Sequence, residues 1–162
     1  MRKRTIATLV CSALGLIGVS GSALADTIGR YDCHIVGTAI PEPIADRSGH
    51  GLASTQFSCF GVDGLLKSAV YSAINVTEWD GPKGTFLLAG GTHRSAGGLA
   101  VTQMLEGAGS MIMKDGKPAG TESSGKAVVK FASGTLAAIS GKTVKFTTKP
   151  LDFGRFELEF TD

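Results

Sequence analysis

The stretch Arg155–Phe160 reads RFELEF and carries the clearest secondary-structure signal in the chain. Two phenylalanines and a leucine occupy every second position, and charged residues occupy the positions between them. Because successive side chains of a strand point to opposite faces of a sheet, this alternation predicts a strand with one dry face and one wet face. We therefore expect the end of the chain to lie in a half-buried antiparallel sheet.

Similar alternation, interrupted by turn residues, runs through much of the chain, and few windows show helical periodicity. Asp115-Gly116 predicts a two-residue hairpin turn, because both residue types tolerate positive φ. Gly81-Pro82, Gly90-Gly91 and Gly97-Gly98 predict further breaks. Residues 38–54 include two prolines and predict a long loop. The predicted strands span residues 30–37, 55–61, 65–79, 84–92, 98–105, 109–114, 125–131, 142–148 and 154–161.

Many short strands in one small domain predict an all-β fold. We expect a single antiparallel β-barrel of about eight strands, closed or nearly closed, because closure removes the sheet edges that invite aggregation. Glycines at bends suit such a strongly coiled sheet. A β-sandwich is the alternative.

The stretch Phe131–Phe146, FASGTLAAISGKTVKF, places a short compact segment between an apolar segment and an alternating one. Gly134, Thr135 and Gly141 match a GTGxFxxxxG turn, with Leu136 where the second glycine of that turn would stand. In this feature the last third of the chain resembles the dirigent and allene oxide cyclase-like barrels, which have a calycin-type architecture. The resemblance implies a barrel, with Leu136 and Ile139 as plugs of one end, and it transfers no catalytic residue.

We expect the first 25 residues to be a secretory signal peptide. Residues 2–4 form a basic start, residues 5–19 are mainly apolar, and Ala23-Leu24-Ala25 supplies the small residues that a signal peptidase requires. The apolar run is too short to span a bilayer comfortably, so no membrane span is expected after cleavage. The mature domain would then comprise residues 26–162 and be periplasmic or secreted.

Cleavage changes both the charge and the cysteine count of the chain. Of its 16 Lys and Arg and 14 Asp and Glu, three basic residues lie in the first 25 positions, which leaves 13 basic and 14 acidic residues. This near-neutral balance gives no electrostatic support for nucleic-acid binding. Cleavage also removes Cys11, and the remaining Cys33 and Cys59 are expected to form a disulfide in an oxidising compartment.

Candidate ligand contacts come from the long loop and from the expected inner face of the barrel. His50 and Arg47, within DRSGHG, and His93, after a double glycine, are expected near the barrel mouth. Trp79, the only tryptophan, offers a flat apolar face and one hydrogen-bond donor. The remaining expected lining residues are Phe86, Leu88, Met104, Met111 and Met113.

A closed sheet of this size can hold one small ligand, so we expect an exported barrel that binds a small apolar molecule. One alternative is an isomerase or cyclase-like enzyme, which rests on the resemblance and would use His50, Arg47 and His93. A second is a structural or interaction protein of the cell envelope with a filled barrel. A third is a periplasmic copper carrier that uses the three methionines. From the sequence we assign no catalytic residue, no cofactor and no metal site, and we favour a protein that is not an enzyme.

Overall fold

The computed structural model describes residues 26–152 and 154–162. The predicted signal peptide, residues 1–25, lies outside the described residues. Strands make up most of the described chain, with one short 3₁₀ helix, η1 (Ala137–Ile139). The strands are β1 (Thr27–Val36), β2 (Glu42–Pro43), β3 (His50–Gly64), β4 (Val70–Asp80), β5 (Lys83–Ser95), β6 (Gly98–Lys114), β7 (Lys117–Gly134), β8 (Thr143–Asp152) and β9 (Arg155–Thr161).

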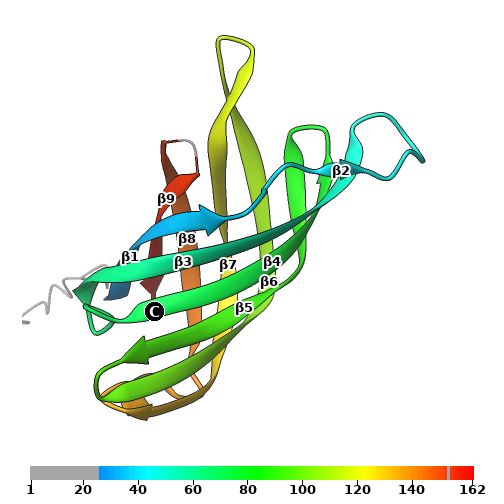
Figure 1. The fold of residues 1–162 in the computed structure, drawn as a ribbon. Coiled ribbons are helices and arrows are strands. Elements are labelled where there is room, and N and C mark those ends of the chain that lie inside the picture. The colour runs from blue at the N-terminus through cyan, green and yellow to red at the C-terminus, as the bar shows by residue number, and fades with distance from the viewer. Residues whose placement is uncertain (1–25, 153) are drawn as a thin grey trace, which may run out of the picture.

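The strands form one closed antiparallel barrel (Figure 1). Neighbours along the chain pair from β3 to β9, and β1 pairs with both β9 and β3, which closes a ring of eight strands. The two-residue strand β2 pairs with β3 alone and lies outside the ring. The predicted all-β barrel of about eight strands is therefore confirmed, and the alternative β-sandwich is wrong.

Several predicted boundaries differ from the structure. The segments 98–105 and 109–114 belong to the single strand β6, and Gly90-Gly91 lies inside β5 instead of breaking it. Strand β3 begins at His50, within the predicted loop 38–54, and residues 65–69 form a turn before β4. The Asp115-Gly116 turn is confirmed, with φ of 52° and 74° at its two residues.

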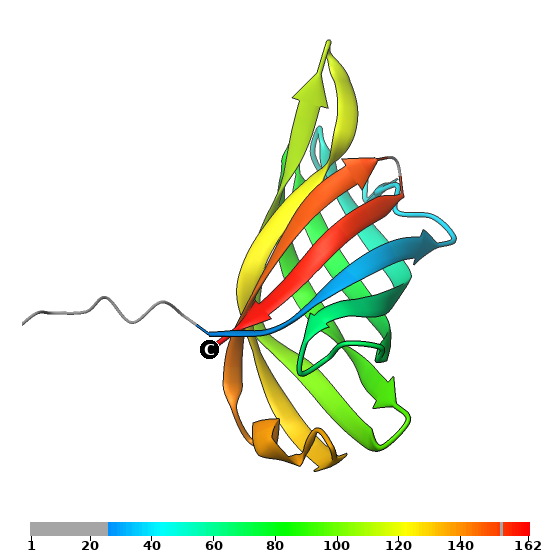
Figure 2. The ribbon, with the colours of Figure 1, turned by 90° about the vertical axis from the view of Figure 1, so that its left-hand side faces the viewer.

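One end of the barrel is closed by the connection between β7 and β8, drawn in orange in Figure 2. Gly134 begins this connection with φ of 59°, and a Cβ there would lie on the Gly97 carbonyl, so only glycine fits. Leu136 and Ile139 then turn into the barrel, where their side chains are buried in the core. Leu66, from the β3–β4 turn, joins them. These side chains close the end as the sequence predicted for Leu136 and Ile139.

The junction that closes the ring is held by a covalent bond and by ion pairs. Cys33 of β1 and Cys59 of β3 face each other in register and form the predicted disulfide, with both side chains buried. On the outer face, Arg30 of β1 contacts Asp63 of β3 at 3.6 Å and Glu157 of β9 at 3.8 Å. Strand β1 is thus linked to both of its neighbours.

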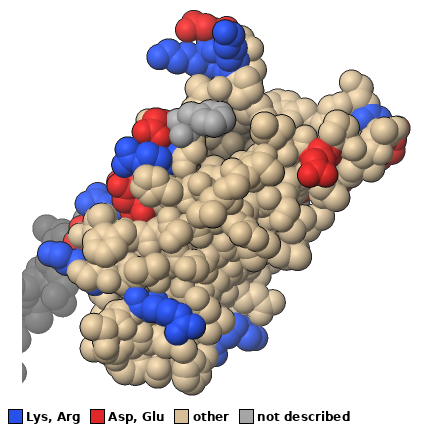
Figure 3. Space-filling model, in the orientation of Figure 1, with Lys and Arg blue, Asp and Glu red and all other residues tan. Residues whose placement is uncertain are grey.

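The outer surface over β3, β4 and β5 carries few charged side chains, which lie mainly around its edges (Figure 3). Large apolar side chains, including Phe60, Ile74, Leu87 and Leu88, are exposed on the outside of the barrel. Among the described residues, none belongs to a helix long and apolar enough to cross a membrane.

Candidate functional site

The lumen of the barrel holds a cavity of about 1030 Å³. All eight strands of the ring contribute lining residues. Ligand pockets commonly have volumes of roughly 300–1,000 Å³, so this cavity lies at the upper end of that range. The lumen therefore has room for one small molecule.

The cavity opens at the end of the barrel opposite the η1 plug. Its lining there includes residues 37–41 of the β1–β3 loop, Pro118 beside the β6–β7 hairpin, and Gly154 between β8 and β9. Ile40 in this loop is 71% exposed, so the lining is continuous with solvent at this end. A ligand would enter here and be stopped by the packed core at the other end.

Inward-facing glycines keep the lumen hollow by receiving aromatic rings from other strands. A Cβ at Gly107 of β6 would lie 2.7 Å from the Phe86 ring of β5. A Cβ at Gly125 of β7 would likewise lie 2.7 Å from the Phe146 ring of β8. Each ring thus occupies the space that a side chain on the opposing position would fill, and it rests against the wall instead of extending across the lumen.

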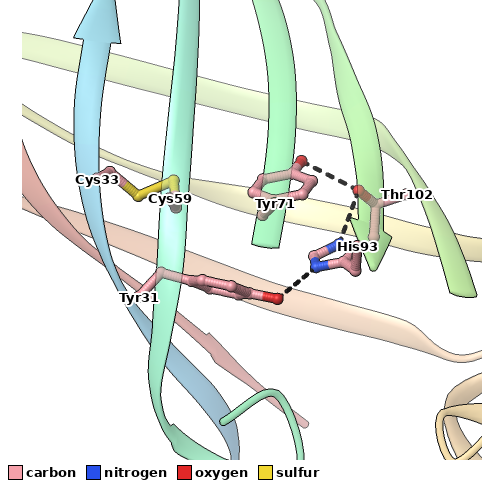
Figure 4. Close-up of a disulfide and its surroundings, with 6 residues drawn as sticks. All are labelled: Tyr31, Cys33, Cys59, Tyr71, His93 and Thr102. Atoms are coloured by element: carbon pink, nitrogen blue, oxygen red, sulfur yellow. Dashed lines mark hydrogen bonds between the residues drawn. A yellow bond between two sulfur atoms is a disulfide. The ribbon is translucent and has the colours of Figure 1, made fainter. Parts of the chain in front are cut away.

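The floor of the cavity is a buried hydrogen-bond network (Figure 4). Tyr31 Oη lies 2.7 Å from His93 Nδ1, and His93 Nε2 lies 3.2 Å from Thr102 Oγ1. Tyr71 Oη lies 3.0 Å from the same Thr102 oxygen, and the Tyr71 ring stacks on the imidazole with centroids 4.0 Å apart. Tyr71 and Thr102 line the cavity, whereas Tyr31 and His93 lie behind them.

One proton arrangement satisfies the whole network. The Tyr31 hydroxyl donates to Nδ1 of a neutral His93, and Nε2–H donates to Thr102. Tyr71 donates to the same Thr102 oxygen, which in turn donates to the Gly91 carbonyl at 3.4 Å. Burial lowers the pKa of His93 to about 3 and raises the pKa of Tyr71 to about 12, so both groups are uncharged at neutral pH. The floor therefore presents neutral hydroxyls to the lumen.

His50 is part of a separate charged cluster that fastens the β1–β3 loop to β4. Its Nδ1 lies 2.5 Å from Asp46 and its Nε2 lies 2.8 Å from Glu78, so a protonated ring donates to both carboxylates. These hydrogen bonds raise the pKa of His50. Arg47 completes the cluster by contacting Asp46 at 3.1 Å and Asp80 at 3.4 Å.

The structure places the predicted site residues in three groups. Trp79, Phe86, Met104 and Met111 line the cavity. His50 and Arg47 lie in the loop cluster and do not line it, and His93 is 2% exposed behind the cavity floor, far from the predicted mouth position. None of these three residues borders the cavity, and the predicted position of His93 near the mouth is wrong.

Leu88 and Met113 were also predicted to line the lumen. This prediction is wrong, since each residue is 51% exposed and neither borders the cavity. A register shift between β4 and β5 leaves both Leu87 and Leu88 exposed on the outside. Met113 lies near the tip of the β6–β7 hairpin, which extends beyond the barrel (Figure 2). The three methionines therefore do not face a common space.

The polar residues of the lumen were not among the predicted lining residues. Asn75 and Thr77 of β4, and Ser123 and Thr148 on β7 and β8, line the cavity. Asn75 and Thr77 were accessible to prediction, because they alternate with outward residues in phase with Trp79. Ser123 and Thr148 lie in stretches with few apolar residues, so the sequence does not show which side chains there point inward.

Among the residues that the structure describes, no group of three or more His, Cys, Asp or Glu side chains is arranged to hold a metal ion. Comparisons with protein-family models, curated proteins and solved structures found no match to this chain. The resemblance of residues 131–146 to the dirigent and allene oxide cyclase-like turn stays a prediction.

Proposed function

We propose that this chain is an exported β-barrel protein that binds a small, largely apolar molecule in its lumen. The observation that carries the proposal is the cavity of about 1030 Å³, open at one end and bordered by aromatic rings from several strands. Burial of an apolar ligand against such rings is favourable by about 25 cal/mol per Å² of apolar surface removed from water. Export is supported by the signal-peptide pattern of residues 1–25 and is compatible with the Cys33–Cys59 disulfide.

Trp79 provides a direct assay, because the only tryptophan in the chain borders the cavity. We would purify residues 26–162 from a periplasm and titrate them with N-phenyl-1-naphthylamine, a neutral apolar dye that absorbs tryptophan emission. Binding in the lumen predicts saturable quenching of Trp79 together with a rise in dye fluorescence. Native mass spectrometry of the same preparation would detect any ligand retained from the cell.

Two matched variants locate the bound dye. Gly109→Phe adds a ring to an inward position of β6, where a Cβ meets no atom closer than 3.4 Å. Ala108→Phe adds the same ring to the exposed neighbouring position. We expect the Gly109 variant to lose dye binding and the Ala108 variant to keep it. Equal dye affinity in both variants, or an absence of saturable binding, would overturn the proposal.

The outer surface favours a second candidate, an interaction protein of the envelope. The face over β3–β5 is poor in charge, and Leu87 and Leu88 are exposed on β5 (Figure 3). Large exposed apolar patches commonly mark association sites. Analytical ultracentrifugation of the mature domain and of Leu88→Glu tests for self-association through this surface. A monomer at all concentrations for both proteins would remove the support for self-association.

The enzyme alternative lacks the site that it was expected to use. His50, Arg47 and His93 do not border the cavity, so they could not contact a substrate bound there. The copper alternative relied on three methionines, of which Met113 lies outside the lumen.

A further inference from the structure

The order of the strands determines which walls of the lumen face each other. Around the closed ring the strands follow the order β1, β3, β4, β5, β6, β7, β8 and β9. In a ring of eight, strands four places apart lie on opposite sides, so β3 faces β7, β4 faces β8 and β5 faces β9. Cavity-lining residues on these pairs therefore approach a central ligand from opposite directions.

Two opposing sides of the lumen carry neutral polar side chains. On one side, β4 presents Asn75 and Thr77, whose hydroxyl donates to Asn75 Oδ1 at 3.3 Å. Among the described residues, none accepts a hydrogen bond from the Asn75 amide nitrogen. On the other side, Ser123 of β7 and Thr148 of β8 form a hydroxyl pair at 2.7 Å. Each wall can offer both a donor and an acceptor to a ligand.

Two pairs of aromatic rings supply much of the apolar lining. Phe57 of β3 and Phe156 of β9 pack together with ring centroids 5.3 Å apart, and Phe86 of β5 and Phe146 of β8 approach each other to 6.2 Å. All four rings line the cavity. The first pair flanks β1 and the second lies over glycines of β6 and β7, so aromatic rings and neutral polar groups each border the lumen cross-section from opposite sides. Such a section matches a molecule with an apolar body and polar groups on two opposite edges.

Charge is confined to the mouth of the cavity. Within the described lining, the side chains of Asp, Glu, Lys and Arg comprise those of Asp152 and Arg155. These two residues pair with each other at 3.2 Å, and Arg155 also contacts Asp32 at 3.1 Å. An ionised group of a ligand that lay deeper in the lumen would lose its hydration without gaining a partner of opposite charge, which is energetically costly.

We infer that the lumen selects a neutral molecule with a rigid apolar body and hydroxyl or carbonyl groups on two opposite edges. This inference rests on the proposed function and specifies its ligand class. The apolar body lies between the two phenylalanine pairs, and the two polar edges bond to the Asn75–Thr77 and Ser123–Thr148 pairs.

A matched probe series tests the class by isothermal titration calorimetry. The four probes are 4,4′-biphenol, 4-phenylphenol, biphenyl and biphenyl-4-carboxylate, which share one skeleton and differ in the number of hydroxyls and in charge. We expect affinity to fall from the diol to the mono-alcohol to the hydrocarbon, by roughly three- to tenfold for each hydroxyl lost. The carboxylate is expected to bind more weakly than 4-phenylphenol.

Isosteric variants assign the two edges to the two walls. Thr77→Val and Thr148→Val each remove one hydroxyl from opposite walls, and Thr85→Val removes an exposed hydroxyl of β5 as the control. Each inward variant is expected to weaken the binding of 4,4′-biphenol by roughly three- to tenfold while leaving the affinity for biphenyl unchanged. Retained binding of N-phenyl-1-naphthylamine shows that the lumen of each variant is intact.

The possible failures are distinguishable. Binding of the dye and of biphenyl with no gain from either hydroxyl, or a preference for the carboxylate, would overturn the ligand class and leave lumen binding standing. Equal effects of the inward variants and Thr85→Val would also overturn it. Failure of every probe, including the dye, would overturn the proposed function itself.

Discussion

His93 makes the stability of the barrel depend on pH in a way that can be calculated. Burial lowers its folded pKa from 6.5 to about 3, so the folded chain holds His93 neutral where the unfolded chain protonates it. Acidification therefore favours the unfolded state. The stability that neutral His93 provides is complete above its unfolded pKa and is lost as the pH falls from about 6.5 toward about 3.

The size of the effect follows from the two pKa values. Over this window one more proton binds to the unfolded chain than to the folded one, and stability falls by about 1.4 kcal/mol per pH unit. Integrated from about pH 7.5 to about pH 4.5, the loss attributable to His93 is roughly 3 kcal/mol. This is a large fraction of the 5–15 kcal/mol that typically stabilises a domain.

Urea unfolding of the wild type and of His93→Gln at a series of pH values isolates this contribution. Glutamine can accept a hydrogen bond from Tyr31 and donate one to Thr102 but does not titrate. The stability deficit of the variant should therefore shrink by roughly 3 kcal/mol between the two pH limits. His34→Gln is the control, because His34 is exposed on β1, and it should follow the wild-type profile. A deficit of His93→Gln that stays constant with pH would refute the reasoning.

Three further predictions concern the disulfide, the plug and the loop cluster. Replacing Cys33 and Cys59 by alanine should lower the free energy of unfolding in urea by roughly 3 kcal/mol, because the disulfide closes a loop of 26 residues and so reduces the entropy of the unfolded chain. A decrease of less than about 1 kcal/mol would contradict that origin. Leu136→Ala should cost about 2–5 kcal/mol in the same assay, because Leu136 is 1% exposed, while the exposed Leu87→Ala should cost less than about 0.5 kcal/mol. His50 has a raised pKa, so its stabilisation is complete below about pH 6.5 and is lost as the pH rises through the folded value. As the pH rises through that range, the urea midpoint of the wild type should fall relative to that of His50→Gln. Midpoints of the two proteins that change in parallel with pH would contradict this role of His50.

Much of the architecture was predictable because alternation depends only on local sequence. The RFELEF segment forms β9, with Leu158 and Phe160 buried, and Leu136 and Ile139 plug the barrel beside it. Such patterns survive because a strand with one buried face requires them along its whole length. The disulfide was predictable for a different reason, since two cysteines allow one pairing within a chain.

The errors in the predicted lining residues arise where the alternation between inward and outward side chains shifts. The extra residue in β5 lets Leu87 and Leu88 both face outward, so counting alternate positions from Phe86 assigns Leu88 to the wrong side. The predicted position of His93 was wrong because the direction of its strand was not known. Strand β5 runs from the open end at Lys83 to the closed end at Ser95, so a residue after Gly90-Gly91 lies deep in the barrel. Neither a bulge nor a strand direction is encoded by local alternation.

Composition alone does not decide whether this barrel is hollow, because its glycines favour a cavity and its phenylalanines favour a filled core. The pairing across strands decides it. Phe86 meets Gly107 and Phe146 meets Gly125, so each large ring fills the space left by a missing side chain on another strand. Had the rings faced residues with side chains, they would have been forced across the lumen. The cavity, and with it the capacity to hold a ligand, therefore depends on the register that places each ring against a glycine.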